Sequence, residues 1–305
     1  MTNSSVASVV EQALRIARAE PHDLLVIAGP TASGKTALAV ELAERLDGEV
    51  ISADSIQIYR AFDVGSGKPT ADELARVRHH MVGVLDPMAP SDAVTWAEAA
   101  SAAIADMRSR GRVPIVCGGT FLWIKTLIFG LAAAPGASEK TRSRHRAIAT
   151  ESGRPALHAL LRTVDPDCAA RIHPNDFVRV SRALEVHELT GRPMSRWHEE
   201  HGFSNVRHRA RLMAIAHEPG ELTDRIATRT ASWLEEGWVE EVQGLLSAGY
   251  GGARAMGSVG YAQVRAALEG RLAHADLPAA IVRATRVFAR RQRTWLRNVD
   301  VAWLR

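Results

Sequence analysis

The sequence predicts an α/β protein with a doubly wound parallel sheet and a helical insertion domain. Three observations lead to this prediction. Apolar runs alternate with helical segments up to Ala132, a glycine-rich loop separates the first run from the first helix, and residues 138–205 show no clear strand. Strands that alternate with helices along a chain are typical of parallel sheets with helices on both faces.

Each core strand is predicted from a short apolar run that ends at glycine or at a polar residue. We expect strands over residues 24–28, 49–53, 81–85, 113–117 and 212–216. Helices are expected over residues 35–46 and 92–110, and Gly118-Gly119-Thr120 opens a third. Residues 1–20 indicate a mobile or helical extension without assignable chemistry, and the chain after the last strand is expected to be helical.

The domain organisation follows from a change of pattern near Ala132, where alanine, proline and glycine form a hinge-like stretch. We expect residues 22–134 to form the first part of the α/β core. Residues 135–207 are expected to form the helical insertion. Residues 208–305 would return to the core with its last strand and its C-terminal helices.

The composition is that of an ordinary globular chain, with 46% hydrophobic and 24% charged residues among 305. No apolar run approaches the roughly 18 residues that span a bilayer. Charges at Glu11, Arg15 and Arg18 interrupt the segment where a signal peptide needs an apolar core. We therefore expect a cytoplasmic protein without membrane association. The two cysteines, Cys117 and Cys168, have the spacing of neither a zinc site nor a disulfide framework.

Basic charge is concentrated in the last part of the sequence. The whole chain carries a net charge of +4, whereas residues 278–305 contain seven arginines, no lysine and one acid. Five of these arginines have the spacing of one helical face: Arg283, Arg286, Arg290, Arg293 and Arg297. A solvated charged face is one explanation, but arginine without lysine favours binding to the phosphates of a polyanion.

One motif carries specific chemistry. Gly29-Pro30-Thr31-Ala32-Ser33-Gly34-Lys35-Thr36 is a complete GxxxxGK[ST] P-loop between a predicted strand and a predicted helix. In this context backbone N–H groups and the helix N-terminus hold phosphate oxygens, Lys35 adds a charge, and the Thr36 hydroxyl is a candidate Mg²⁺ ligand. The alternative is a glycine-rich turn without phosphate chemistry, which the order of strand, motif and helix disfavours. The predicted sheet is therefore P-loop NTPase-like.

A P-loop identifies a phosphate site and not a reaction. Kinases and ATPases need an acid at the end of a nearby strand to hold Mg²⁺, yet the fourth predicted strand ends in Cys117-Gly118-Gly119. Asp86 ends the third strand and is a weak candidate because Pro87 follows it. Asp54 ends the second strand, so we expect it beside the P-loop as a proton acceptor. A helix cap or turn cap is the alternative role for Asp54.

Further motifs follow in order along the chain: Ser52–Arg60, Gly65–Thr70, His79-His80, Gly118–Thr120, Ile172–Asp176, Arg182–Glu185, Thr190-Gly191 with Ser195, Ser258–Tyr261 and Arg290–Trp295. With this set, the chain closely resembles the bacterial-type tRNA dimethylallyltransferase family, the tRNA isopentenyltransferases, over about residues 24–298. No other P-loop family known to us shares the set.

The resemblance implies transfer of a dimethylallyl group from dimethylallyl diphosphate to N6 of the adenosine 3′-adjacent to the anticodon in tRNA. It implies that Gly29 to Thr36 hold the diphosphate together with Mg²⁺, which explains a P-loop without a good ATPase acid. Thr31 and Arg229 would act on the diphosphate, and Asp54 would take a proton from the adenine amino group. Donors and Mg²⁺ aimed at the diphosphate would stabilise the charge that grows as the allylic C–O bond breaks.

The resemblance also implies that the anticodon stem-loop of tRNA is the partner and that the target base is flipped into the pocket. The expected tRNA-binding residues are Asp54, Ser55, Ile56, Gln57, Thr120, Arg142, Val178, Arg179, Val180, Ser181, Arg182, Ser258, Val259, Gly260, Tyr261, Ala262, Gln263, Arg290 and Arg293. Gln57 would contact the flipped base, and the insertion would close over the stem-loop. Ala262 stands where the family usually has a basic residue. A monomer is expected.

Three other functions share part of these features. An ATP-dependent small-molecule kinase shares the P-loop and the sheet, but it does not predict the motif at Ile172–Asp176 or the arginine face. A transferase that acts on free adenine nucleotide needs neither the helical insertion nor the basic C-terminal segment. A non-catalytic RNA-binding protein needs neither an intact P-loop nor Asp54.

Overall fold

The computed structural model describes residues 3–20 and 23–305 and divides into two compact units. Unit 1 comprises Met1–Ile128 and Arg207–Arg305, and unit 2 comprises Phe129–Val206. The chain leaves and re-enters unit 1 at one place, because the Arg207 N–H donates to the Ile128 carbonyl at 2.7 Å. The predicted start of the core at residue 22, and the first two residues of the predicted N-terminal extension, lie outside the described residues.

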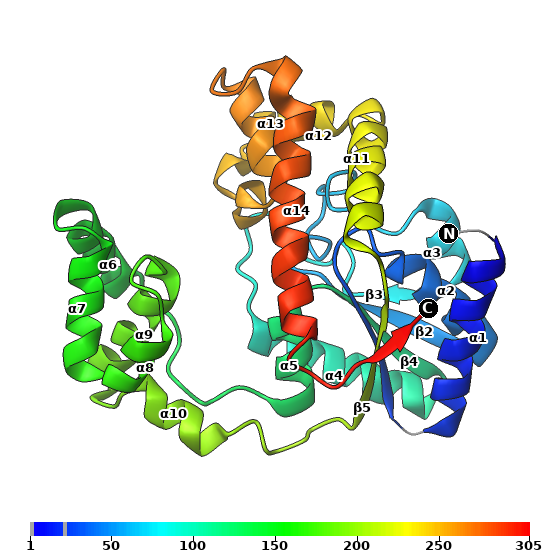
Figure 1. Cartoon of the computed structure of the whole chain (residues 1–305), viewed down its shortest axis with the longest axis horizontal. Coiled ribbons are helices and arrows are strands. Elements are labelled where there is room, and N and C mark those ends of the chain that lie inside the picture. The colour runs from blue at the N-terminus through cyan, green and yellow to red at the C-terminus, as the bar shows by residue number, and fades with distance from the viewer. Residues whose placement is uncertain (1–2, 21–22) are drawn as a thin grey trace. The chain divides into compact units, whose positions relative to one another are not determined.

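A parallel sheet forms the centre of unit 1 (Figure 1). Its strands are β1 (Leu24–Ala28), β2 (Gly48–Ala53), β3 (His79–His80), β4 (Val113–Gly118), β5 (Ala210–Ile215) and β6 (Ala302–Leu304). The spatial order is β3-β2-β4-β1-β5-β6, and every neighbouring pair is parallel. This arrangement confirms the predicted α/β class with a doubly wound parallel sheet.

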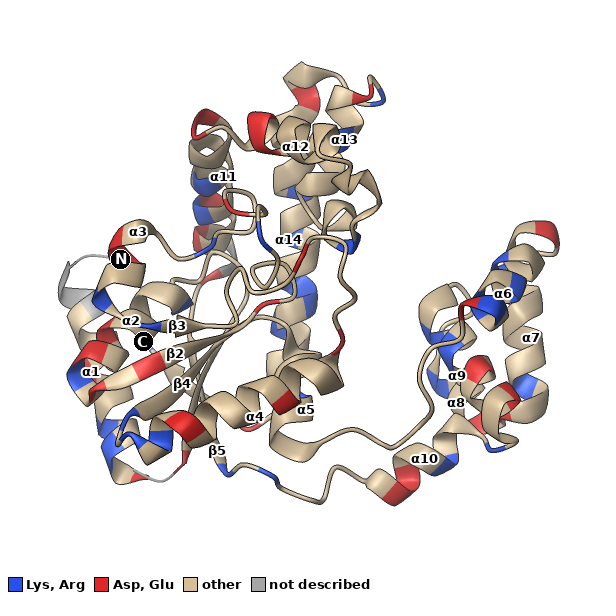
Figure 2. Ribbon diagram, turned by 180° about the vertical axis from the view of Figure 1, so that it is seen from behind, with Lys and Arg blue, Asp and Glu red and all other residues tan. Residues whose placement is uncertain are grey.

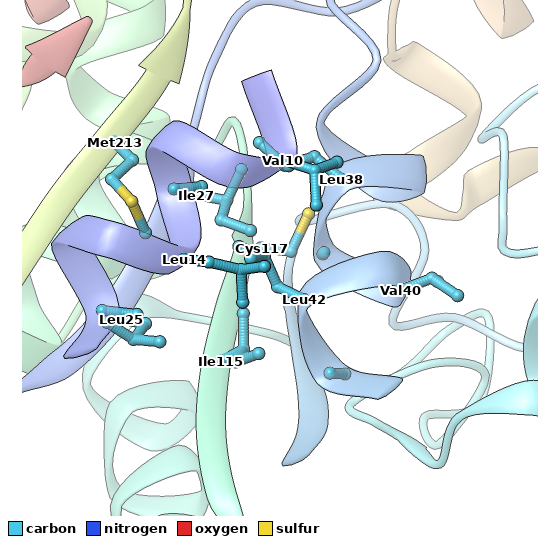
Figure 3. Close-up of a cluster of buried hydrophobic side chains, with 14 of the residues drawn as sticks. Val10, Leu14, Leu25, Ile27, Leu38, Val40, Leu42, Ile115, Cys117 and Met213 are labelled. Carbon is cyan, nitrogen blue, oxygen red and sulfur yellow. The ribbon is translucent and has the colours of Figure 1, made fainter. Parts of the chain in front are cut away.

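The sheet is buried on both faces. Leu25 and Ile27 of β1 belong to the cluster that the sheet forms with α1 (Asn3–Ala19) and α2 (Lys35–Leu46) (Figure 3). The alternate residues Leu24 and Val26 are also completely buried. Because successive side chains of a strand point to opposite faces, an apolar run without alternation is typical of a strand covered on both sides.

The predicted N-terminal extension is the helix α1, which forms part of the core. Val10 and Leu14 lie in the same buried cluster as Leu38 and Leu42 of α2 (Figure 3). The Gln12 side chain donates to the Arg305 carbonyl at 2.7 Å and accepts from its N–H at 3.1 Å, which joins α1 to the C-terminal residue. No described helix is long and apolar enough to cross a membrane.

Some helices of unit 1 pack on the sheet, and others pack on one another. They are α3 (Ala71–Arg76), α4 (Ala93–Ser109), α5 (Phe121–Phe129), α11 (Pro219–Glu235), α12 (Trp238–Ser247), α13 (Tyr261–Leu268) and α14 (Leu277–Leu296), with 3-10 turns at Tyr250–Gly252, Arg254–Gly257 and His274–Asp276. The indole N–H of Trp96 in α4 donates to the Ser52 carbonyl of β2 at 3.1 Å. Helices α11 and α14 lie side by side, and α13 packs on α14 (Figure 1).

Two strand predictions were wrong. The third strand is not residues 81–85, because the edge strand is β3, His79–His80. Met81 and Gly83 have φ values of 61° and 60°, and a left-handed backbone cannot continue a strand. The chain after β5 is also not wholly helical, since β6 pairs with β5. A three-residue strand is too short for a periodic pattern to reveal.

Unit 2 is helical, as predicted for the insertion. Its helices are α6 (Glu139–Glu151), α7 (Arg154–Val164), α8 (Pro166–Arg171), α9 (Phe177–Thr190) and α10 (Met194–His201). Leu157, Leu161 and Leu184 contribute to a small core of its own. Asp176 begins α9 by accepting from the Arg179 N–H at 3.2 Å, which is the arrangement of a helix N-cap.

Candidate active site

The carboxyl ends of β1, β4 and β2 bring the P-loop and Asp54 to one edge of the sheet. Ala28, which ends β1, pairs with Gly118, and Gly118 also pairs with Ala53, which ends β2. A Cβ atom at Gly118 would collide with the Ala53 carbonyl, so the close approach of the strands requires glycine here. Ligands of parallel α/β sheets bind at this edge, where the strand order reverses.

The P-loop is held from outside by side chains that come much later in the sequence. Arg225 Nε donates to the Ala32 carbonyl at 2.8 Å, and His217 Nε2 lies 2.8 Å from the Ser33 carbonyl. Ala32 has a φ of 65°, a left-handed conformation that costs a residue with a side chain about 1 kcal/mol. With two carbonyl oxygens engaged, the loop can present N–H groups to an anion.

Gln292 of α14 fastens the P-loop to the turn after β4. Its Oε1 accepts from the Thr31 N–H at 2.9 Å, and its Nε2 donates to the Gly119 carbonyl at 3.0 Å. The Gln292 side chain is buried, and a Cβ atom at Gly119 would collide with its amide. A buried amide with both ends bonded has one orientation, so Gln292 fixes where Thr31 lies.

Two cations converge on the P-loop. Arg229 of α11 donates from Nη2 to the Thr31 hydroxyl at 2.5 Å. Burial lowers the pKa of Arg229 to about 10, and Asp54 opposes this shift, so the guanidinium remains charged at neutral pH. Burial likewise lowers the pKa of Lys35, and the neighbouring Cys117 and Asp54 oppose that shift. Cations with little solvation attract an anion more strongly than cations in bulk water do.

The Asp54 side chain caps a turn, which is the alternative role that the sequence analysis gave it. Its Oδ1 accepts from the N–H groups of Ile56 at 2.8 Å and Gln57 at 3.2 Å. The same residue lines a cavity of about 280 Å³ together with Thr31 and Arg229. Capping and catalysis are therefore compatible, because a carboxylate with one oxygen fixed by the backbone is oriented for proton transfer. The cavity brings all three predicted catalytic residues together.

Several residues predicted to bind tRNA line the same cavity: Ser55, Ile56, Thr120, Ser258 and Val259. Gln57 is engaged elsewhere, since its Oε1 accepts from the Ser52 hydroxyl at 2.8 Å and its Nε2 donates to the Gly67 carbonyl at 2.7 Å. An RNA base that reaches Gln57 has to replace these bonds.

The other predicted residues of this region begin α13: Gly260, Tyr261, Ala262 and Gln263. Tyr261 is completely buried, its hydroxyl donates to Glu241 Oε1 at 2.6 Å, and burial raises its pKa. Glu241 also accepts from the N–H groups of Asp63 at 2.8 Å and Val64 at 2.6 Å. Tyr261 and Glu241 therefore hold the loop that leads to Gly65, a residue of the cavity wall.

A smaller cavity beside the P-loop is lined by Thr36, Asp54, Ser52 and Cys117. Burial raises the pKa of the Cys117 thiol to about 11, so the thiol is neutral at physiological pH. Among the described residues, no three His, Cys, Asp or Glu side chains form a metal-binding group. Mg²⁺ usually takes few protein ligands and completes its shell with phosphate oxygens and water. Thr36 and Asp54, which both line this small cavity, fit that requirement.

The arginine face of α14 lies opposite the face that lines the cavity. Ile281, Thr285 and Phe288 line the cavity. Arg283, Arg286, Arg290 and Arg293 line a separate groove that α14 forms with α11. Each residue of a helix is rotated by 100° from the one before, so the two sets are about half a turn apart. Figure 2 shows this basic helix. None of the described carboxylates forms an ion pair with those four arginines.

In unit 2, the predicted tRNA-binding residues divide between surface and core. Val178 and Arg179 are exposed on α9, with 74% of the Val178 residue and 74% of the Arg179 side chain accessible. Val180 and Ser181 are buried, and the Ser181 hydroxyl lies 2.9 Å from His145 Nδ1. Four consecutive residues of a helix point in different directions, so the first two are the ones whose side chains a partner can reach.

Arg142 and Arg182 both bind the buried carboxylate of Glu185. Arg142 Nε lies 3.0 Å from one carboxylate oxygen, and Arg182 Nη1 lies 2.7 Å from the other. Burial opposes ionisation of Glu185, yet these hydrogen bonds keep its pKa below the ordinary value. A phosphate that binds either arginine has to compete with this carboxylate.

Some residues that shape the site were not found from the sequence. Arg225 and Trp233 stand four residues before and four residues after the predicted Arg229 and share its face of α11, a signal that the sequence did contain. The Arg229 guanidinium carbon lies 4.3 Å from the centre of the Trp233 ring. The partners of Gln292 lie far from it in sequence, so no local pattern could predict them.

Comparison with known proteins gives consistent matches along most of the chain. The family model for IPP transferase matches residues 57–299. A tRNA dimethylallyltransferase of Sorangium cellulosum (strain So ce56) is 62% identical over 289 residues, covering 95% of this chain and 92% of that protein. A tRNA dimethylallyltransferase of Myxococcus xanthus (strain DK1622) is 46% identical over 275 residues, covering 90% and 89%.

Solved structures agree with these matches. The tRNA isopentenylpyrophosphate transferase of Bacillus halodurans superposes with a TM-score of 0.68 at 35% identity, covering 93% of this chain and 89% of that chain. A eukaryotic dimethylallyltransferase acting on tRNA superposes with a TM-score of 0.72 at 26% identity, covering 90% of this chain and 69% of that chain. The chain therefore belongs to the IPP transferase family, the family of the tRNA dimethylallyltransferases.

Proposed function

We propose that this chain transfers a dimethylallyl group from dimethylallyl diphosphate to N6 of the adenosine 3′-adjacent to the anticodon in tRNA. The observation that carries the proposal is the single cavity in which Thr31 and Arg229 meet Asp54. Family membership supports the substrate class. We further propose that the enzyme acts in the cytoplasm as a monomer.

The diphosphate of the donor binds in the P-loop. Loop N–H groups, Lys35, Arg229 and the Thr31 hydroxyl contact its oxygens. When the bond between C1 and oxygen breaks, its electron pair stays on the diphosphate, and contacts that strengthen with this charge lower the barrier. Mg²⁺ at Thr36 supplies further positive charge to the leaving group when it is bound.

The acceptor base enters from the side of the cavity lined by Thr120 and Ser258. An adenine stacked in an anticodon loop cannot reach a buried carbon, so the base has to be flipped out of the stack. The N6 lone pair forms the new bond to C1, and the N6 proton passes to the carboxylate of Asp54. The turn cap that holds Asp54 Oδ1 keeps this carboxylate oriented toward the base.

The remainder of the tRNA contacts charged and exposed surfaces. Arg290 and Arg293 of α14 bind backbone phosphates, because they line a groove and form no ion pair with a carboxylate in the part of the chain that the structure describes. Val178 and Arg179 at the start of α9 contact the anticodon stem-loop. These contacts are mainly electrostatic, and they weaken as salt concentration rises.

The geometry gives little support to the alternative that this P-loop belongs to a kinase. Asp86, the alternative Mg²⁺ acid, caps its own turn by accepting from the Met88 N–H at 2.9 Å and forms an ion pair with Arg60. It lines neither the large nor the small cavity. Asp54 lines both of these cavities, and its carboxylate suits proton transfer from a nucleophile.

Transfer of a labelled donor distinguishes these functions. The protein is incubated with labelled dimethylallyl diphosphate and Mg²⁺, together with unmodified tRNA, with AMP, or with ATP and candidate small-molecule acceptors. We expect label in tRNA alone, at the adenosine beside the anticodon. Label in AMP alone would assign a free-nucleotide transferase, and rapid ATP turnover without transfer would assign a kinase or ATPase.

A further inference from the structure

Two tryptophans form one wall of the catalytic cavity. Trp233 of α11 and Trp238 at the start of α12 both line it, with ring centres 5.6 Å apart and ring planes at 87°. Trp238 is only 2% exposed, and Trp233 is partly exposed. The wall stands next to the diphosphate end, because the guanidinium of Arg229 lies 4.3 Å above the Trp233 ring.

Three glycines hold the two rings in place. A Cβ atom at Gly65 would collide with the pyrrole edge of Trp238, and one at Gly260 would collide with its benzene edge. A Cβ atom at Gly67 would lie 2.7 Å from Trp233. Gly67 and Gly260 also have φ values of 60° and 92°, so both positions favour glycine for conformation as well as for space. The rings therefore contact backbone, which cannot turn aside as a side chain can.

The contacts of Arg229 with Thr31 and with the Trp233 ring indicate where the carbon chain of the donor begins. Thr31 and Arg229 hold the diphosphate under the proposed function, and the Trp233 ring lies directly beneath Arg229. A carbon chain attached to the diphosphate therefore starts beside Trp233, and Trp238 stands edge-on behind it.

The hydrophobic effect alone would favour a longer donor. Each additional carbon that leaves water improves binding. A cavity whose end can be displaced would therefore bind a ten-carbon allylic diphosphate more tightly than a five-carbon one. Selection of the short donor needs a wall that resists displacement. Overpacking against side chains that are fixed by backbone forces larger rearrangements, which is the situation at Trp233 and Trp238.

We propose that Trp233 and Trp238, fixed on Gly65, Gly67 and Gly260, are specificity residues that limit the donor to a single prenyl unit. This inference rests on the proposed dimethylallyl transfer and adds the residues that exclude geranyl diphosphate.

Donor competition tests the wall directly. The ratio of kcat/KM for geranyl diphosphate to that for dimethylallyl diphosphate is measured with one unmodified tRNA for the wild type, Trp233→Ala, Trp233→Leu and Trp238→Phe. We expect the wild type to favour the short donor and Trp233→Ala to raise the ratio about 10-fold or more, which is the scale of methylene discrimination in apolar pockets. Loss of the ring under Arg229 slows both donors, but the ratio removes that common effect.

Trp197→Ala is the matched control. Trp197 also lies beneath an arginine, Arg192, at 4.9 Å, but it belongs to α10 of unit 2 and does not line the cavity. The ratio of kcat/KM for the two donors should be the same in Trp197→Ala as in the wild type. If Trp233→Ala unfolds, Trp233→Leu and Trp238→Phe, which keep an apolar side chain in place, supply the same comparison with smaller expected changes.

Two outcomes would overturn the inference. One is a wild type that uses geranyl diphosphate as well as dimethylallyl diphosphate. The other is a set of Trp233 variants with an unchanged donor ratio and a raised KM for tRNA, which would place the ring on the RNA base. A wild type that transfers neither group to tRNA is a different result, since it contradicts the proposed function itself.

Discussion

At the scale of single residues, the site depends on side chains that perform two tasks. Asp54 caps a turn through Oδ1 and lines the catalytic cavity. Thr31 binds Gln292 through its N–H and Arg229 through its hydroxyl, so it is fixed on two sides before a donor arrives. Preorganised donors stabilise a transition state more than mobile donors because they need not reorganise during the reaction.

Asp54→Asn separates the two tasks of Asp54. An asparagine oxygen can still accept from the Ile56 and Gln57 N–H groups, so the turn should persist, but the side chain can no longer take a proton. We expect kcat to fall by about 10²- to 10⁴-fold, the usual contribution of a general base, with tRNA affinity nearly unchanged. Single-turnover kinetics and tRNA binding measure the two effects.

Asp86→Asn is the control for Asp54→Asn. Asp86 is another turn-capping aspartate of unit 1, and it lines neither cavity. Its substitution should leave kcat unchanged. A loss of tRNA affinity in Asp54→Asn with an intact kcat would show that Asp54 binds RNA and is not the base.

At the scale of elements, prediction succeeded where the determinants are local. The strand before the P-loop and the strand before Asp54 were visible as apolar runs, and both lie where expected. The run at 81–85 failed because the conformations of Met81 and Gly83 are set by the loop they contact and not by apolar content. Gln292 and Glu241 were missed because hydrogen bonds across the fold leave no periodic trace in the sequence.

One buried carboxylate joins three elements at the sheet edge. Arg110, at the end of α4, donates to both carboxylate oxygens of Glu49 in β2, and Glu49 Oε2 also lies 2.7 Å from His80 Nε2 of β3. The hydrogen bond from Arg110 is the main reason why the pKa of Glu49 falls to about 2, with His80 contributing in the same direction against burial. Because the folded pKa lies below the ordinary value, Glu49 stabilises the fold above about pH 4.5.

Glu49→Gln should therefore destabilise the protein by about 3 kcal/mol at neutral pH, the equivalent of a shift of this size. The difference from the wild type should shrink as pH falls below about 4.5 and vanish below about pH 2, where the wild-type carboxylate is also protonated. Urea unfolding at a series of pH values measures this difference in the free energy of unfolding. Glu44→Gln, at an exposed ion pair with Arg76, should change stability little at any pH. If the loss of stability in Glu49→Gln does not depend on pH, the charge of Glu49 is not its cause.

At the scale of the whole molecule, α14 separates two functions by its two faces. One face lines the cavity through Ile281 and Thr285 and reaches the P-loop through Gln292. The opposite face carries the arginine groove. The sequence predicted the arginine face because helical spacing is a local property. It could not show which element the opposite face contacts, because that depends on how α11 and the sheet pack around it.

Arg290→Ala should weaken tRNA binding and lower the slope of log affinity against log salt by about one, the change expected for one lost phosphate contact. The donor KM should stay unchanged, because Arg290 lies outside the cavity lining. Arg45→Ala is the control, since Arg45 is also an exposed arginine of unit 1 but is paired with Glu41. Filter binding at several salt concentrations measures the slopes. Equal slopes for wild type and Arg290→Ala would mean that this arginine contacts no phosphate.

The bond between Gln292 and the P-loop has a consequence for how the enzyme is made. Thr31 and Gln292 are 261 residues apart in the sequence. A ribosome adds about 5–20 residues per second, so the P-loop leaves the ribosome roughly ten seconds or more before its fastening residue exists. The glycine-rich motif is therefore synthesised well before it can reach its working geometry. Diphosphate binding should therefore appear in nascent chains only after α14 has emerged.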